Sequence, residues 1–280
     1  MITHLDIKPR VPGSADLSMV SGLDVSLEDG ALRPGADLVV EEDFVRPLSA
    51  LAKVLAAPIE APGDRSEYRM LNGVRRDQDS HLDGLPWRYE LTAMTGAPLG
   101  WEAAKTAGHT HVRAAGASLG YPEVVEVLHG EAGFLMQDLR SGTGGPTSTR
   151  AWIVRAGPGD WVLFPPGLAH VTIDLGVGPL VFSDVIDREA AGMYDAVAAA
   201  RGFAWYVGAD GELRANDRYL HTPPIEVCSA REWSGPAPGP LYEAFRDDPK
   251  RFSWLSDGDA FPDVAPLVWE RVGETVTSLG

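Results

Sequence analysis

Short apolar segments separated by turn residues fill the middle of the chain. Between residues 67 and 186, runs rich in Val, Ile, Leu and aromatic residues are bounded by Gly, Pro and Asn. Many short strands at this spacing are typical of an all-β barrel or sandwich. The expected strands cover Glu67–Leu71, Trp87–Met94, Ala103–Arg113, Glu123–Leu128, Ala132–Asp138, Ala151–Arg155, Asp160–Phe164, Ala169–Asp174 and Leu180–Ile186.

The segments on either side of these strands have other patterns. Residues 1–30 have no period and are expected to be irregular, whereas the apolar spacing over Glu41–Ala57 predicts a helix. A short helix over Tyr194–Arg201 and a hairpin over 204–215 follow the strands. The last fifty residues carry three tryptophans, which suggests that they pack against the barrel or a partner subunit. We therefore expect an N-terminal arm (1–40), a barrel domain (41–225) and a C-terminal extension (226–280).

Composition narrows the class of protein. The 280 residues include 24 basic and 40 acidic side chains, a formal net charge of −16. Such a surface repels phosphodiester backbones and anionic lipids, so neither a nucleic acid nor a membrane is an expected partner. The single cysteine, Cys228, excludes an intrachain disulfide and a cysteine-rich metal site. The first residues lack the apolar core of a signal peptide, and we expect a cytoplasmic protein.

Two of the seven histidines form the pair His109-x-His111. Residues i and i+2 of a strand face the same side about 6.5–7 Å apart, so both imidazoles can reach one metal ion. An HxH pair also arises by chance among seven histidines. Alone, it is a weak signal for a metal site.

The surroundings of this pair resemble the two motifs of the cupin superfamily. Gly108 precedes the pair, Glu123 opens an E-x6-G segment that ends at Gly130, and a later G-x5-P-x-G-x2-H segment ends at His170. The resemblance implies an all-β, jelly-roll-like barrel with a few short helices. It also implies one divalent transition metal ion held by His109, His111, Glu123 and His170. Eleven residues separate His111 from Glu123, where three or four are usual, so a longer loop is expected.

Further segments are similar to the cupin-type phosphoglucose isomerases. They are TAGHTH (106–111), EVVEVLHGEAG (123–133), LFPPGLAHVTIDLGVGPLVF (163–182) and VRPLSAL (45–51). The resemblance implies aldose–ketose isomerisation of a hexose phosphate, by default glucose 6-phosphate and fructose 6-phosphate, in a homodimer. Carried over by position, the residues that hold the substrate phosphate are Tyr68, Thr92, Thr106, Gly108 and Tyr194.

Chemistry assigns Glu123 the catalytic role in this interpretation. It would act as the base that moves a proton between C1 and C2 through an enediol; a hydride shift is the rival route. The ligand set suits Fe, Mn, Ni or Zn without choosing among them. Two residues depart from the family pattern: Ala107 replaces a lysine, and Val125 replaces a tyrosine that points into the cavity.

Three alternatives stay open at this stage. They are a cupin isomerase or epimerase acting on another sugar in a specialised pathway, an Fe-dependent dioxygenase with the same ligands, and a sugar-binding cupin without activity. Strand alternation places Glu126 on the opposite face from Glu123, where a solvated surface carboxylate is expected.

Overall fold

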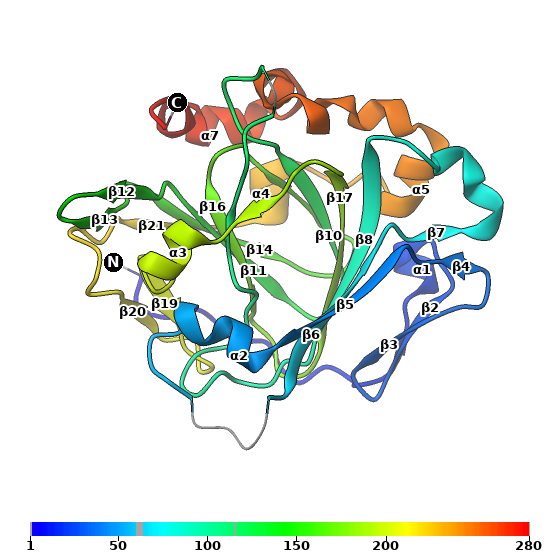
Figure 1. Ribbon diagram of the computed structural model, residues 1–280. Coiled ribbons are helices and arrows are strands. Elements are labelled where there is room, and N and C mark those ends of the chain that lie inside the picture. The colour runs from blue at the N-terminus through cyan, green and yellow to red at the C-terminus, as the bar shows by residue number, and fades with distance from the viewer. Residues whose placement is uncertain (1, 60–63, 115, 280) are drawn as a thin grey trace.

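Two sheets face each other and form the walls of a barrel (Figure 1). The structure, a computed structural model, describes residues 2–59, 64–114 and 116–279. The larger sheet contains, in spatial order, β15 (Trp161–Phe164), β10 (Glu123–His129), β17 (Leu180–Asp187), β8 (Trp87–Met94), β6 (Ser66–Asn72) and β5 (Glu42–Pro47). The smaller sheet contains β16 (Ala169–Asp174), β11 (Ala132–Gln137), β14 (Ala151–Ala156) and β21 (Ile225–Ser229). The prediction of an all-β barrel with short helices is confirmed.

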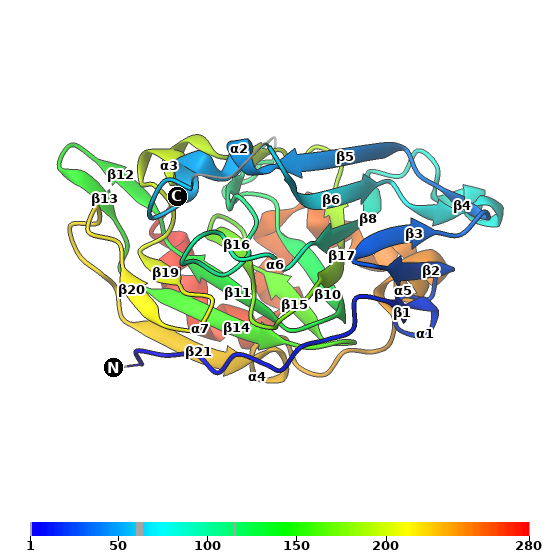
Figure 2. The ribbon, with the colours of Figure 1, turned by 90° about the horizontal axis from the view of Figure 1, so that it is seen from below.

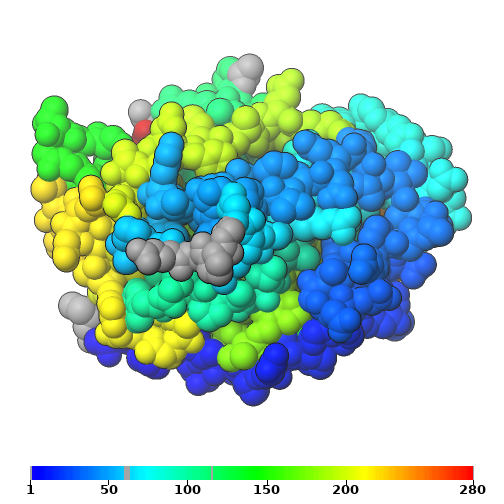
Figure 3. Space-filling model, turned by 60° about the horizontal axis from the view of Figure 1, so that its bottom comes forward, coloured from blue at the N-terminus to red at the C-terminus, as the bar shows by residue number. Residues whose placement is uncertain are grey.

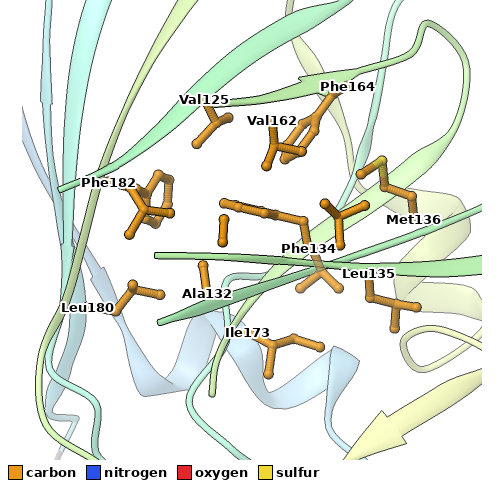
Figure 4. Close-up of a cluster of buried hydrophobic side chains, with 14 of the residues drawn as sticks. Val125, Ala132, Phe134, Leu135, Met136, Val162, Phe164, Ile173, Leu180 and Phe182 are labelled. Carbon is orange, nitrogen blue, oxygen red and sulfur yellow. The ribbon is translucent and has the colours of Figure 1, made fainter. Parts of the chain in front are cut away.

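The apolar core lies between these sheets. Phe134 is fully buried, and its ring meets those of Phe164 and Phe182 edge to face, with centroids 5.3 and 6.5 Å apart. Figure 4 shows Val125 and Val162 on the same side of Phe134 as these rings. In Figure 2, β5 and β6 lie on one side of this core and β14 and β21 on the other. Packed aromatic pairs of this kind hold the two walls together.

One predicted strand is wrong for most of its length. Of the residues Ala103–Arg113, only Thr110–His111 (β9) form a strand, which pairs with β18 (Gly192–Met193). The remainder makes isolated bridges. The reason is Gly108, whose φ of 71° is a left-handed conformation that ends a regular strand.

The predicted helix over Glu41–Ala57 is wrong in its first half. Residues 42–47 form β5, which pairs along β6, and only α2 (Leu48–Leu51) and a 3-10 turn (Ala52–Val54) are helical. Pro47 lies at the junction between β5 and α2. Its ring fixes a backbone angle that is compatible with the residue before a helix, and its nitrogen carries no hydrogen to donate to a strand partner. The apolar spacing that suggested a helix is genuine only from Leu48 onwards.

The N-terminal residues are more ordered than the sequence suggests. They form a small sheet of β1 (Ala15–Asp16), β2 (Val25–Glu28) and β3 (Ala31–Pro34), with α1 (Ser18–Ser21) between its first two strands. Leucines and valines of this segment, including Leu23 and Leu27, are almost completely buried. In Figure 3 the segment lies, dark blue, along one edge of the molecule. The predicted irregularity of residues 1–30 is therefore wrong for Ala15–Asp16, Ser18–Ser21 and Val25–Glu28.

Short elements complete the ends of the barrel. The helix after β18 is α3 (Asp195–Ala199), and the expected hairpin is formed by β19 (Trp205–Val207) and β20 (Leu213–Ala215). Two other short pairs are β12 (Arg140–Gly142) with β13 (Gly145–Thr147), and β4 (Leu38–Val39) with β7 (Arg75–Arg76), which precedes a 3-10 helix (Asp77–Leu82). Among the described residues, no helix is both long and apolar enough to cross a membrane.

The last fifty residues wrap the outside of the barrel. After β21 come α4 (Ala230–Ser234), α5 (Leu241–Asp247), 3-10 helices (Pro249–Ser256 and Gly258–Ala260), α6 (Phe261–Val264) and α7 (Pro266–Thr277). Figure 1 shows the orange and red segments α5 and α7 on the same side of the barrel. Trp233 is fully buried, and its Nε1 donates a hydrogen bond to the Leu163 carbonyl at 2.9 Å. The Leu163 amide in turn donates to Ser234 Oγ at 3.0 Å, so α4 satisfies backbone groups on the edge strand β15.

This cover overturns the expectation that Glu126 is solvated. Its side chain does lie on the outer face of β10, but it is only 1% exposed and accepts a hydrogen bond from the Leu241 amide at 2.9 Å. The outer face of a barrel strand is solvated only where nothing covers it, and here α5 does. Burial raises the pKa of Glu126 to about 8, an effect that the Leu241 hydrogen bond partly offsets.

Truncating Trp233 tests the contribution of this outer layer. We expect Trp233→Ala to lower the free energy of unfolding by about 3–5 kcal/mol, because it leaves a large cavity and removes a hydrogen bond to an edge strand. Leu267→Ala, at a site 51% exposed in α7, is the control and should change it by less than about 0.5 kcal/mol. Urea unfolding measures both, and equal effects would contradict a packed extension.

The pKa of Glu126 predicts a pH dependence. A folded-state pKa near 8 against about 4.5 in the unfolded chain means that the folded state binds this proton more tightly. The stabilisation that it provides is complete below about pH 4.5 and is lost as the pH rises towards 8. We expect the free energy of unfolding to fall less steeply between pH 5 and 8 in Glu126→Gln than in the unmodified protein. Parallel curves would show that this carboxyl does not titrate as described.

Candidate metal centre and substrate cavity

Three histidines meet at one end of the barrel interior. His109 and His111 flank Thr110 at β9, and His170 is the second residue of β16. The backbones of His109 and His170 bond to each other in both directions, N to O, at 3.0 and 2.9 Å. One ring nitrogen from each histidine lies within 4.8 Å of the others, and the Nε2 atoms of His109 and His111 are 3.1 Å apart. The backbone bridge thus fixes ligands from distant parts of the sequence beside each other.

Backbone carbonyls set the tautomers of two of these rings. His111 Nδ1 donates to the Tyr121 carbonyl at 2.9 Å, and His170 Nδ1 donates to the Leu168 carbonyl at 3.2 Å. A neutral imidazole that carries its proton on Nδ1 presents a lone pair on Nε2. Tyr121 belongs to the long loop between His111 and Glu123, so the lengthened loop supplies the group that orients His111.

The electrostatics of the cluster favour a cation. Burial, together with the neighbouring imidazoles, lowers the pKa of His109 and of His170 well below the usual value, and burial lowers that of His111 to about 4. The rings are therefore neutral near pH 7. His170 Nε2 is buried and has no hydrogen-bond partner among the described residues. Neutral imidazole nitrogens are common ligands of divalent transition metals, so this donor set fits such an ion.

Glu123 borders the same point. It is the first residue of β10, and its Oε2 lies 3.5 Å from His111 Nε2 and 3.7 Å from His170 Nε2. Two atoms that each lie about 2.1 Å from one tetrahedral metal ion are about 3.4 Å from each other, which is close to these two distances. Burial, and then the charge of Glu90, raise the pKa of Glu123 to about 8. The four residues expected from the sequence are thus brought together.

A cavity of about 330 Å³ opens beside this cluster. Of the residues predicted to hold a phosphate, Tyr68, Thr92, Thr106 and Tyr194 line it. Gly108 lies between two lining residues and is required by its conformation, because a Cβ there would come within 2.5 Å of the Phe203 ring. Another cavity, of about 480 Å³, lies between Trp101 and Arg218 and contains no histidine.

Some hydroxyl groups in the cavity already accept a hydrogen bond from a backbone amide. Tyr68 is buried, and its hydroxyl accepts a hydrogen bond from the Ala107 amide at 3.4 Å. Thr106 Oγ1 accepts from the Thr172 amide at 3.1 Å. Tyr194 is 40% exposed and packs its ring 5.2 Å from that of His109. All three hydroxyls keep a proton that can be donated to an anion.

The sequence analysis missed Arg46 as a cavity residue. Its guanidinium lies 4.8 Å from the Phe44 ring, 5.9 Å from that of Tyr68 and 5.6 Å from that of Tyr194. Its Nε is buried and has no hydrogen-bond partner among the described residues. Arg46 belongs to the VRPLSAL segment that carried the resemblance, but the helix predicted there hid its place on a barrel strand.

Four charged residues were also missed: Arg88, Glu90, Asp184 and Arg188 all line the cavity. Arg88, Glu90 and Thr92 alternate along β8, a pattern that places them on one face of the strand. The valine at position 125, where the family pattern has a tyrosine, adds no hydroxyl group to the cavity. Val125 packs in the apolar cluster of Figure 4, and the described residues that line the cavity do not include it.

Comparisons with known proteins identify the family of this chain. The family model described as glucose-6-phosphate isomerase matches residues 44–223, well over half of the chain. Glucose-6-phosphate isomerase from Thermococcus kodakarensis is 28% identical over 202 residues, which cover 70% of this chain and 93% of that protein.

Solved structures give weaker likenesses. A cupin 2 conserved barrel domain protein from Rhodopseudomonas palustris is 14% identical, with a TM-score of 0.30 over 53% of this chain and 74% of that one. An oxalate decarboxylase from Bacillus subtilis is 16% identical, with a TM-score of 0.31 over 55% and 31%. Scores this low carry no argument about function. On its family match, its barrel and its paired histidine motifs, the chain belongs to the cupin-type glucose-6-phosphate isomerase family.

Proposed function

We propose that this protein is a metal-dependent isomerase that interconverts an aldose phosphate and a ketose phosphate. Glucose 6-phosphate and fructose 6-phosphate are the default pair. The observation that carries the proposal is the convergence of three neutral imidazoles and Glu123 on the wall of a cavity that also holds an arginine and several hydroxyl groups. Family membership supports the reaction class.

The metal ligands in this proposal are His109, His111, Glu123 and His170. Fe, Mn, Ni and Zn all suit three imidazoles and one carboxylate. When bound, the ion would supply positive charge for the oxygens on C1 and C2 of the sugar. The carbonyls of Tyr121 and Leu168 hold two of the imidazoles in the tautomer that this role needs.

The phosphate end of the cavity is formed by Arg46 and the hydroxyls of Tyr68, Thr92, Thr106 and Tyr194. A phosphate dianion needs positive charge as well as donors, and Arg46 is the cation that lies between the two tyrosine rings. Its unpartnered Nε gives it a donor to offer.

Glu123 is the proposed catalytic base. Among the described residues, it is the carboxylate that lies against the histidine cluster, so it adjoins the carbons whose oxygens the ion would hold. It would take the proton from one carbon of the enediol pair and return it to the other. Phe164, Phe182 and Ile186 line the same cavity and give it an apolar side.

The reaction predicts a labelled product. With fructose 6-phosphate in D2O, the protein loaded with Fe, Mn, Ni or Zn should give glucose 6-phosphate that carries deuterium at C2, as measured by NMR. Deuterium enters because a carboxylate base exchanges its proton with solvent. Unlabelled glucose 6-phosphate would favour the hydride shift, and no conversion with any of these metals would contradict the proposed substrate.

Two histidine variants, His170→Ala and His129→Ala, test whether activity depends on the metal ion. His170→Ala should lose both the bound metal, by elemental analysis, and at least about 100-fold in turnover. His129→Ala is the matched control, since this β10 residue bonds to the Pro12 carbonyl outside the cavity. It should keep both the metal and the activity.

The place of Arg46 in the cavity predicts that the enzyme prefers a phosphorylated sugar to the same sugar without phosphate. We expect Arg46→Ala to lower kcat/KM for the sugar phosphate about 10- to 100-fold, mainly through KM, because a charge-assisted hydrogen bond contributes about 1.5–3 kcal/mol. Arg46→Lys should recover part of this loss. Arg69→Ala is the control, because Arg69 on β6 pairs with Asp43 away from the cavity. An equal loss for the sugar without its phosphate would contradict the assignment.

A further inference from the structure

A row of side chains crosses the cavity wall from β10 to β8. Val125 on β10 pairs with Asp184 on β17, and Asp184 pairs directly with Glu90 on β8. Paired residues in neighbouring strands point to the same face of a sheet. Asp184 and Glu90 therefore stand side by side on the inner wall, and both line the cavity.

The two carboxylates have unequal surroundings. Glu90 forms an ion pair with Arg88, its neighbour two residues away on β8. Asp184 is only 5% exposed, and none of the described residues donates a hydrogen bond or an ion pair to its carboxylate. A buried carboxyl without partners is costly, and a second carboxyl directly opposite adds to the cost.

The pKa of Asp184 reflects this energetic cost. Burial, followed by the charges of Glu90 and Glu123, raises the pKa of Asp184 well above that of an ordinary aspartate, and Arg88 offsets only part of the rise. Packing gives no reason for an acid here, since the next member of the row is a valine in the apolar cluster. An acid of this kind is explained if a bound molecule supplies the missing donors.

We infer that Asp184 is a specificity-determining residue that accepts a hydrogen bond from a hydroxyl group of the sugar. The inference rests on the proposed function and names the substrate class more closely. The ligand is a polyhydroxylated sugar phosphate, with its phosphate at Arg46 and one free hydroxyl at Asp184. Asp184 lies between Glu90 and the valine two residues after Glu123, so the bonded hydroxyl belongs to a carbon near the metal end of the cavity. A sugar that lacks this hydroxyl leaves the carboxyl unpaired and is rejected.

The test uses binding, so that it does not depend on turnover. The probes are a hexitol 6-phosphate, which is the reduced and unreactive form of the substrate, and its derivatives that lack one hydroxyl each. Calorimetry on the Zn-loaded protein should find one derivative bound about 10- to 100-fold more weakly than the parent, because a buried acceptor stays unsatisfied. In Asp184→Ala, which removes the acceptor, this ratio should fall to about 1; in Asp184→Asn, which keeps an uncharged and weaker acceptor, it should fall part of the way.

Glu126→Gln provides the matched control. Both Asp184→Asn and Glu126→Gln remove a buried carboxyl charge from the same sheet, Asp184 on the inner face and Glu126 on the outer. Both should raise the Tm without ligand, by about 2–4 °C. Only Asp184→Asn should weaken binding of the hexitol phosphate. This comparison separates loss of a ligand contact from a change in stability.

Two results would overturn the inference in different ways. If the hexitol phosphate binds and the Asp184 variants keep both its affinity and the discrimination against the deoxy derivative, Asp184 does not contact the sugar, while the proposed function stands. If the unmodified protein binds no hexitol phosphate in the presence of any of the four metals, both the inference and the proposed function fail.

Discussion

The convergence of three buried, neutral imidazoles is the constraint on which the rest of the site depends. His111 and His170 each present a lone pair on Nε2, because the opposite ring nitrogen donates a hydrogen bond to a backbone carbonyl. The reciprocal backbone bonds between His109 and His170 hold these two residues side by side. Burial keeps the pKa of each ring low, so the cluster gathers neutral nitrogen donors and not positive charges at neutral pH. Backbone hydrogen bonds therefore arrange a group of side chains that could hold a metal ion.

The C-terminal extension contributes to this geometry from outside the barrel. The loop that presents the Tyr121 carbonyl to His111 also donates a hydrogen bond from the Ser118 amide to Asp259 at 3.1 Å. Gly258 lies so close to this loop that a Cβ would come within 2.2 Å of the Gly120 carbonyl. Residues near 258 thus support the loop that fixes one imidazole. The loop of eleven residues between His111 and Glu123 is longer than the motif usually has. It packs against the C-terminal extension, a segment that lies outside the motif.

Sequence reasoning succeeded where a pattern depends on local chemistry and failed where it depends on contacts. Strand alternation and turn residues located the barrel strands, and the cupin motifs located four residues that the structure brings together, His109, His111, Glu123 and His170. The helix over Glu41–Ala57 was wrong, because pairing with a distant strand decided the conformation before Pro47. Glu126 was predicted to be exposed to solvent, because the sequence around it does not indicate that α5, more than a hundred residues later, covers it. Asp184 was overlooked for the same reason: only the register between β17 and β8 places it opposite another carboxyl.

The negative charge of the whole chain does not oppose an anionic substrate. A net charge of −16 acts at long range through water and salt, where it is screened within about 10 Å. Inside the cavity the nearest charges dominate, and three arginines, Arg46, Arg88 and Arg188, line it beside three carboxylates. A bound divalent ion would add further positive charge at the histidine end. In the proposed function, Arg46 would bind the phosphate, and the carboxylates that line the cavity would supply hydrogen-bond acceptors for the hydroxyl groups of the sugar.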